Sequence, residues 1–183
     1  MTERDPLQIV LSRLGRAVHA MQYSDGLNPA QWEALRFLTS ANRQSATPGG
    51  MAAYLNATKG TVSQTLIALE QKGLVQRVRC DQDRRVVRLA LTDAGQAMLD
   101  RDPLNHISQA VDGIDGQSRD DLVRNLDGLL RNICLRDSGG KFGKCAACCH
   151  LNDDPESPKC GMNGEWLAGD DLEKICVDFC ERN

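Results

Sequence analysis

The sequence predicts a mainly α-helical protein with one small β-hairpin and a short cysteine-rich segment, residues 138–183, here called the tail. Three observations lead to this fold class. Apolar residues recur at steps of three and four over most of residues 5–135, and between residues 74 and 91 the period changes to that of strands. Six of the eight cysteines fall between Cys145 and Cys180. A composition with 41% hydrophobic and 26% charged residues is that of an ordinary globular protein.

The first two helices are predicted from apolar spacing and from capping residues. Between residues 5 and 22 the apolar side chains lie three or four positions apart, which is the helical period. Asn28 followed by Pro29 is typical of an N-cap and a first helical residue. The helix that they begin carries Trp32 and Leu35 on one face, so this face is expected to point into a core.

Two short helices joined by a tight turn follow. Thr47 and Pro48 repeat the cap-and-proline pattern and begin a helix over residues 49–55. A second helix over residues 58–72 is ended by Gly73, because glycine readily adopts the left-handed conformation found after helices. This arrangement is the helix-turn-helix pattern.

A β-hairpin is predicted directly after this pair, with strands over residues 74–80 and 86–91 and a polar turn between them. Thr92 is expected to cap a helix that continues to about Ala110 with a kink at Pro103, since proline cannot donate a helical hydrogen bond. Ser118 is predicted to cap the last helix, which presents an apolar stripe. The chain is therefore expected to form a winged helix-turn-helix flanked by further helices.

The helix over residues 58–72 is the candidate DNA-reading element. Val62, Leu66 and Leu69 share one stripe and are expected to pack inward, which leaves a polar face of small side chains and lysine. Such a face can enter a major groove, although an ordinary solvated helix face is the alternative. Gln64 is suited to a bidentate contact with adenine. The side chains expected at phosphates are Thr58, Lys59, Thr61 and Ser63.

The hairpin favours a role in DNA binding. Between Lys59 and Arg88 there are seven basic and three acidic residues, although the whole chain has a net charge of −3. Phosphate binding needs a local basic patch rather than a positive total. Arginines on the hairpin are expected to contact the DNA backbone, and the tip is expected to reach a minor groove. These arginines are Arg77, Arg79, Arg84, Arg85 and Arg88.

Three stretches resemble the MarR family: LNPAQWEALRFL, MAAYLNATKGTVSQTLIALEQKGLVQR and DRRVVRLALTDAG. The resemblance covers roughly residues 5–135 and implies a winged-helix domain over residues 1–137, in which the first and last helices form a homodimer. It also implies a palindromic double-stranded DNA operator, a role as a repressor, and a wing whose Asp83 and Arg85 form a pair with Arg84 at the tip. A small-molecule effector is a further possibility in this family. Pro103 departs from the family pattern and leaves the dimer geometry open.

The tail has the chemistry of a metal site. Cys145 and Cys148 form a C-x-x-C pair, and Cys160 and Cys176 follow, so four thiolates are available for zinc or for a [4Fe–4S] cluster. A segment with so few apolar residues is either disordered or organised around a metal. The spacing C-x2-C-x11-C-G-x14-C-x-x-F resembles the high-potential-type iron–sulfur domains in small subunits of glycyl-radical decarboxylases. That resemblance implies one [4Fe–4S] cluster on these four cysteines. The alternative ligands are His150, Cys149 and Cys180.

These observations predict a cytoplasmic transcriptional regulator, a repressor, whose DNA affinity depends on a [4Fe–4S] cluster that senses redox state, oxygen, nitric oxide or iron. The alternative is a regulator with structural Zn²⁺ that responds to a small aromatic or phenolic ligand. An enzyme is not expected: a thiol oxidoreductase could use Cys145 and Cys148, but no nucleotide-binding or hydrolase motif accompanies them. Without a run of about 20 apolar residues, no membrane segment is predicted either.

Overall fold

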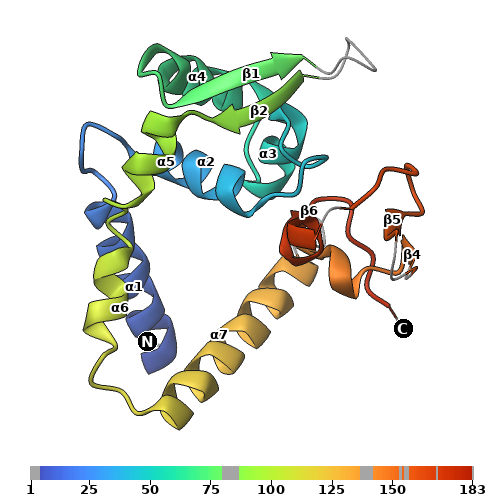
Figure 1. The fold of residues 1–183 in the computed structure, drawn as a ribbon. Coiled ribbons are helices and arrows are strands. Elements are labelled where there is room, and N and C mark those ends of the chain that lie inside the picture. Colours follow the sequence, from blue (N-terminus) through green and yellow to red (C-terminus); the bar gives the residue numbers. More distant parts are fainter. Residues whose placement is uncertain are drawn as a thin grey trace.

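The structure, a computed structural model, describes residues 5–79, 87–136, 142–152, 154, 157–167 and 169–182. Figure 1 shows a body of short helices and a β-hairpin, from which α1 (Pro6–Met21) and α6 (Asn105–Ala110) extend to one side. The long helix α7 (Gly116–Arg136) runs back from their far end to the tail, which lies next to the body. Among the described residues no helix is both long enough and apolar enough to cross a membrane.

The body is a winged helix, and two of its helices begin after the predicted caps Asn28 and Thr47. It contains α2 (Pro29–Ser40), α3 (Pro48–Tyr54) and α4 (Lys59–Gln71). Each is preceded by a residue whose side chain accepts a hydrogen bond from a backbone N–H of the first turn, which satisfies a donor that the helix leaves free. These capping residues are Asn28, Thr47 and Thr58.

The wing is the antiparallel pair of β1 (Val75–Arg79) and β2 (Val87–Leu91). Gly73 separates it from α4 with a φ of 69°, in the left-handed region expected of a glycine that ends a helix. The backbone N–H of Leu89 donates to the carbonyl of Ala46 at 2.8 Å, so the wing is held on the loop that joins α2 to α3 (residues 41–47, the α2–α3 loop). The predicted turn between the strands lies outside the described residues.

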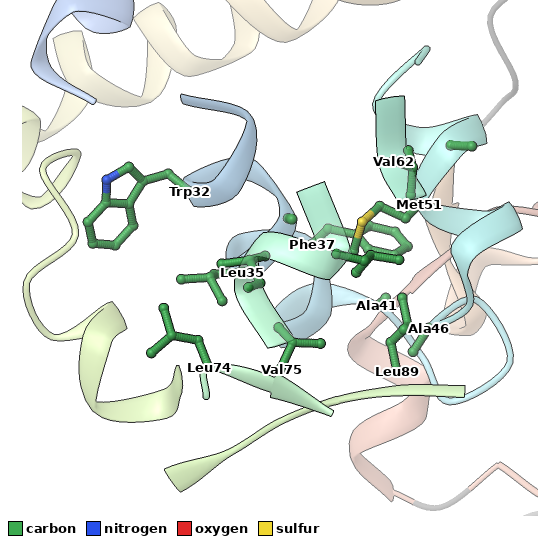
Figure 2. Packing of buried hydrophobic residues seen from close by; sticks show 14 of the residues in the cluster. Trp32, Leu35, Phe37, Ala41, Ala46, Met51, Val62, Leu74, Val75 and Leu89 are labelled. Carbon is green, nitrogen blue, oxygen red and sulfur yellow. The ribbon is translucent and has the colours of Figure 1, made fainter. Parts of the chain in front are cut away.

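The core of the winged helix is enclosed by α2, α3, α4 and the wing (Figure 2). The predicted inward stripe of Val62, Leu66 and Leu69 is at most 2% exposed, and it packs with Trp32 and Phe37. Burying a side chain of this size contributes about 2 kcal/mol to folding. The apolar spacing of α4 therefore fixes which of its faces remains on the surface.

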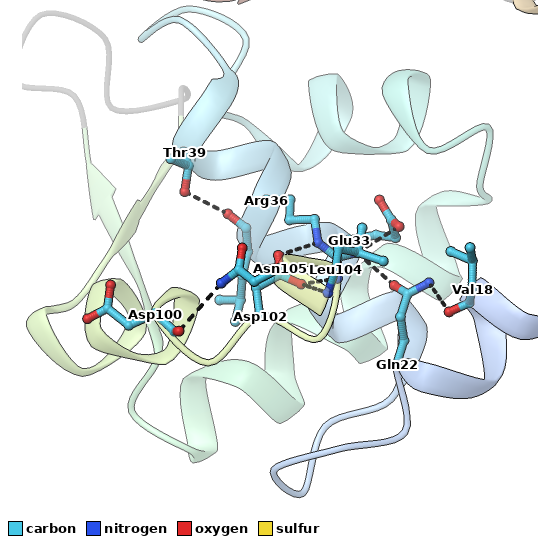
Figure 3. A network of polar contacts seen from close by, with 10 residues as sticks. Val18, Gln22, Glu33, Arg36, Thr39, Asp100, Asp102, Leu104 and Asn105 are labelled. Carbon is cyan, nitrogen blue, oxygen red and sulfur yellow. Dashed lines mark hydrogen bonds and ion pairs between the residues drawn. The ribbon is translucent and has the colours of Figure 1, made fainter. Parts of the chain in front are cut away.

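The prediction of one helix from Thr92 to Ala110 with a kink at Pro103 is wrong. The structure has two helices in this region. α5 (Asp93–Leu99) ends before the proline and α6 begins after it. Proline removes a helical N–H donor and collides with the preceding turn. An ion pair fixes the break: the guanidinium of Arg36 donates from Nε and Nη2 to the two carboxylate oxygens of Asp102 at 2.6 and 2.7 Å (Figure 3). The chain thus changes direction at an anchored point.

Two helices outside the winged helix expose apolar side chains. On α1 these are Leu7, Ile9, Val10 and Leu14, and on α7 they are Leu122, Val123, Leu126, Leu130 and Ile133. The predicted capping role of Ser118 is wrong: α7 begins at Gly116, and the backbone N–H of Ser118 donates to the carboxylate of Asp115 at 3.1 Å. Asp115 caps the helix because its side chain reaches the free donors of the first turn.

The tail is more ordered than its composition predicts. Within its described residues, β3 (Gly143–Lys144) pairs with β6 (Ile175–Cys176), and β4 (Leu151–Asn152) pairs with β5 (Lys159–Cys160). Two 3-10 helices, η1 (Cys145–Ala147) and η2 (Gly169–Glu173), complete it, and η2 overlaps the turn predicted near residues 170–175. The small core of the tail consists of Cys145, Cys176 and Leu167, so sulfur atoms take the place of a larger apolar core.

Candidate metal centre and nucleic-acid interface

The structure brings the four predicted cysteine ligands to one pocket, called here the four-thiol pocket. Cys145 and Cys148 come from η1 and its end, Cys160 from β5 and Cys176 from β6. The pocket has an empty volume of about 300 Å³, open solvent at its mouth included, and His150 also lines it. Cys145, Cys148 and Cys176 are buried and Cys160 is half-buried. Residues 31 positions apart thus supply thiols to one enclosed space.

The separation of these sulfur atoms bears on the kind of group that the pocket fits. Among the described residues, three ligand atoms within 4.8 Å of one another are found at Cys149, His150 and Cys180, and not among the four pocket cysteines. Tetrahedral zinc places its sulfur ligands about 3.8 Å apart. A [4Fe–4S] cluster needs wider spacing, because each thiolate binds a different iron. The all-thiol donor set is compatible with a cluster or with zinc, and no three of the four sulfur atoms lie as close together as the second group does.

Hydrogen bonds shift the pKa values of the buried thiols. The Asn42 side chain donates from Nδ2 to Sγ of Cys145 at 3.2 Å. Cys145 and Cys176 share a further hydrogen bond, which lowers the pKa of Cys176 to about 6 and, together with burial, raises the pKa of Cys145. The shared hydrogen bond therefore favours the thiolate form at Cys176. A thiolate next to buried N–H donors is the form that binds a metal.

The alternative ligands form a second group at the tail surface. Cys149 is exposed, Cys180 is half-buried, and their ligand atoms lie with that of His150 within the 4.8 Å limit. A hydrogen bond with Cys180, and then burial, raises the pKa of Cys149 to about 11. From the sequence we expected these residues as substitutes for one of the four pocket cysteines. In the structure Cys149, His150 and Cys180 form a group of their own.

The tail packs directly on the winged helix through the α2–α3 loop. The backbone N–H of Asn42 donates to the carbonyl of Ile175 at 2.9 Å, and the N–H of Val177 donates to the hydroxyl of Ser45 at 3.0 Å. Asn42 and Ser45 are each 1% exposed. No local pattern marks these two residues, because a polar pair in a loop is normally solvated.

A second contact joins the tail to the wing. Arg88 of β2 donates from Nη2 to the carboxylate of Glu165 at 2.9 Å and from Nη1 to the carbonyl of Arg43 at 3.3 Å. The side chain of Arg88 is 14% exposed. We expected this arginine among the DNA contacts, but in the structure it is directed at the tail. The wing and the α2–α3 loop are thus both in contact with the tail.

The predicted DNA-reading face of α4 lies on the surface. Lys59, Thr61, Ser63 and Gln64 are exposed; Gln64 lies opposite the buried stripe of α4 and the other three flank that stripe. Thr58 is exposed as well, but its hydroxyl accepts from the N–H of Thr61 at 3.1 Å as the N-cap and also bonds the Thr61 hydroxyl. The free polar face therefore begins one residue after the cap.

The arginines of the wing have different surroundings. Arg77 on β1 forms an ion pair with Glu70 of α4 at 3.0 Å, and its side chain is 41% exposed. Arg79 is the last residue of β1. Asp83, Arg84 and Arg85, predicted for the wing tip, lie outside the described residues. Arg77 can exchange its surface partner for a phosphate at little cost, because exposed ion pairs contribute less than about 1 kcal/mol.

Known proteins resemble this chain in the winged-helix region. The family model of the MarR family matches residues 25–86. The chain is 26% identical over 123 residues to the HTH-type transcriptional repressor YetL of Bacillus subtilis, which covers 64% of this chain and 74% of YetL. It is 28% identical over 88 residues to the transcriptional repressor MprA of Escherichia coli, with 48% of this chain and 50% of MprA covered.

Solved structures give the same result for the fold. A MarR-family transcriptional regulator from Silicibacter pomeroyi superposes with a TM-score of 0.58 at 27% identity, over 70% of this chain and 90% of that one. Streptococcus pneumoniae FabT, solved in complex with DNA, gives 0.57 at 24% identity, over 69% and 94%. The helices, the wing and these similarities define a winged-helix fold like that of solved MarR-family structures. About 30% of the chain lies beyond each of these structural matches.

Proposed function

We propose that this chain is a transcriptional repressor that binds a palindromic DNA operator as a homodimer. Its affinity for the operator falls or rises with the state of a metal centre in its tail. Its relatives YetL and MprA are named as repressors, which supports the first part. The exposed polar face of α4, with Gln64 and Lys59, supports reading of base edges and phosphates in a major groove. Arg77 forms an ion pair with Glu70 of α4 and so lies near the surface of this helix.

A homodimer explains the apolar surfaces of α1 and α7. Val10 and Val123 are each about 60% exposed, and Leu130 is 59% exposed. Contiguous apolar surfaces of this kind are covered in stable soluble proteins, most often by a second copy in twofold symmetry. Such a dimer presents two copies of α4, which suits a DNA site with two equivalent halves.

The metal centre proposed for the four-thiol pocket is a [4Fe–4S] cluster held by Cys145, Cys148, Cys160 and Cys176. The all-thiol donor set, the burial of three of the four, and the lack of three sulfur atoms within 4.8 Å of one another among these four support this assignment. When bound, such a cluster supplies redox chemistry and sensitivity to oxygen, nitric oxide and iron supply. Asn42 donates its amide N–H to the Cys145 sulfur and so stabilises negative charge there.

One observation carries the regulatory part of the proposal: the four-thiol pocket is built against the α2–α3 loop. Asn42 contacts a pocket sulfur with its side chain and the β6 backbone with its N–H, and the same loop holds the wing through Ala46. The tail also follows α7 in the sequence, so coupling through that helix is the alternative route. The contacts on the loop and at Arg88 offer a shorter route from the pocket to the DNA-reading elements.

The test compares the operator affinity of full-length protein with and without its metal centre. Duplexes are first selected from a random pool with anaerobically purified protein. Affinity for the selected duplex is then measured for the brown, iron-containing protein, for the chelator-stripped protein and for Cys160→Ser. We expect a change of at least about fivefold, the lower range of allosteric couplings. Selection of no duplex over random DNA would overturn the role as a regulator.

The same purification separates the two metal assignments. Iron and sulfide with a broad visible absorption support the cluster. A colourless protein whose pocket cysteines hold zinc would replace it with a structural site and leave a small aromatic ligand as the signal. Equal operator affinity of loaded, stripped and Cys160→Ser protein would remove the sensor while leaving DNA binding intact.

A further inference from the structure

The six tail cysteines fall into two sets that differ in where their sulfur atoms lie. Four line the buried pocket, whereas Cys149 and Cys180 belong to a group at the surface with His150. Cys148 and Cys149 are neighbours in the chain, yet the first is buried and the second is exposed. A single cluster that uses the four pocket thiols therefore leaves two thiols and an imidazole close together.

The backbone holds this second group in place. The N–H of Cys149 donates to the carbonyl of Cys180 at 2.6 Å, and Cys148 pairs with Glu181 in an antiparallel bridge. Arg182 donates from Nε to the carbonyl of Cys148 and from Nη2 to that of Leu151, both at 3.1 Å. These contacts hold residues 180–182 alongside residues 147–151. The two thiols are therefore kept close by the surrounding chain and not by a bond between them.

We propose that Cys149, His150 and Cys180 form a second metal site, for a single zinc ion, separate from the four-thiol pocket. Their ligand atoms already lie within 4.8 Å of one another. Zinc bonds of about 2.3 Å to sulfur and about 2.0 Å to nitrogen place tetrahedral ligands about 3.5–3.8 Å apart, so binding needs only small side-chain shifts. Two thiolates and an imidazole form a donor set that favours zinc over calcium or magnesium.

Binding is balanced by the release of protons. Cys149 and Cys180 each give up a thiol proton to solvent, His150 binds as the neutral imidazole, and the fourth position of the tetrahedron takes a water molecule. His150 also lines the four-thiol pocket, so this residue borders both sites. The proposal holds whichever group the four-thiol pocket contains, and it is independent of DNA binding.

The test is protection of named thiols by zinc. Full-length reduced protein, whose four-thiol pocket holds its metal centre, receives one equivalent of Zn²⁺ and is then alkylated. The rate of alkylation at each cysteine is followed by peptide mass mapping. We expect Cys149 and Cys180 to react at least about tenfold more slowly with zinc than without it, because bound thiolates are shielded. Unchanged rates at both cysteines, or their recovery as a disulfide under the reducing conditions, would overturn the proposal.

Stoichiometry gives a second measurement that does not depend on reactivity. The wild-type chain is expected to bind one more Zn²⁺ than Cys149→Ser/Cys180→Ser, and His150→Gln is expected to weaken this ion by at least about tenfold. Cys134→Ser is the matched control, since it removes a cysteine of α7 that belongs to neither set and should keep the additional ion. Circular dichroism checks that each variant is folded. Equal zinc content in wild type and double variant would contradict the second site.

Discussion

The side chain of Asn42, just after the second helix, donates a hydrogen bond to the sulfur of Cys145, which lies 103 residues further along the chain. Its carboxamide oxygen accepts from the N–H of Ser45 at 2.8 Å. One buried amide therefore fixes the α2–α3 loop and touches the four-thiol pocket. The winged helix and the tail share this residue as a structural element.

Replacement of Asn42 by alanine should uncouple the two regions. The free energy of unfolding should fall by about 1–3 kcal/mol, because the N–H of Ser45 is left buried without an acceptor. The operator affinity should also lose its dependence on the metal centre. Denaturant unfolding and anisotropy titrations measure the two effects. Arg43→Ala, one residue along at an exposed position, is the control for stability. An Asn42→Ala protein that is as stable as this control would contradict the role of the amide.

The pair of Arg36 and Asp102 should make stability depend on pH. Burial favours the neutral carboxyl, but hydrogen bonds and charge from Arg36 and the N–H of Leu104 outweigh it and hold the pKa of Asp102 below its ordinary value. The stabilisation is present above the ordinary carboxyl pKa of about 3.9 and is lost as the pH falls through the lower folded-state pKa. Asp102→Asn should cost about 2 kcal/mol near neutral pH, with a smaller difference in acid.

Chemical unfolding of wild type and Asp102→Asn at a series of pH values checks this expectation. Asp100→Asn removes an exposed carboxylate from the same segment and serves as the control. A difference between wild type and Asp102→Asn that stays constant from neutral pH into acid would show that the ion pair is not its source.

Gln64 should contribute to sequence discrimination. Gln64→Ala removes a bidentate donor and acceptor from the exposed face of α4, so affinity for the selected operator should fall about tenfold while affinity for random DNA changes little. Competition titrations with both duplexes measure the ratio. Gln71→Ala, exposed at the other end of the helix, is the matched control. Equal losses on operator and random DNA would assign Gln64 to the DNA backbone instead.

The apolar face of α7 should hold the dimer together. Leu130→Asp places a charge on this face and should convert the protein to a monomer at micromolar concentration, since an unpaired charge in an apolar interface costs several kcal/mol. Sedimentation velocity reports the state of association. Asn125→Asp adds the same charge at an exposed polar position of the helix and should leave the dimer unchanged. Association of Leu130→Asp at wild-type strength would place the interface elsewhere.

Local signals predict most of the winged helix. Asn28, Thr47 and Thr58 each precede a helix because their side chains satisfy free N–H groups, and this information lies within four residues. Pro103 shows where local reasoning stops. A proline can kink a helix or end it, and the ion pair between Arg36 and Asp102, 66 residues apart, fixes the break that the structure shows.

The tail separates what spacing can predict from what it cannot. Spacing predicts that Cys145, Cys148, Cys160 and Cys176 act together, and the structure gathers them in one pocket. It does not predict that Cys149 points elsewhere with Cys180, because that depends on which backbone segments pair. The contact of the tail with Ser45 and Arg88 is likewise a tertiary contact without a local pattern.

The ion pair between Arg88 and Glu165 has an electrostatic consequence for the encounter with DNA. Between Cys145 and Asn183 the chain holds nine acidic and three basic residues. If the chain binds DNA as proposed, Glu165 competes with phosphates for Arg88 and the acidic segment adds negative charge next to the wing. Its release would free one arginine and move negative charge away from the wing. Association would then be faster at low ionic strength and would fall more steeply with added salt.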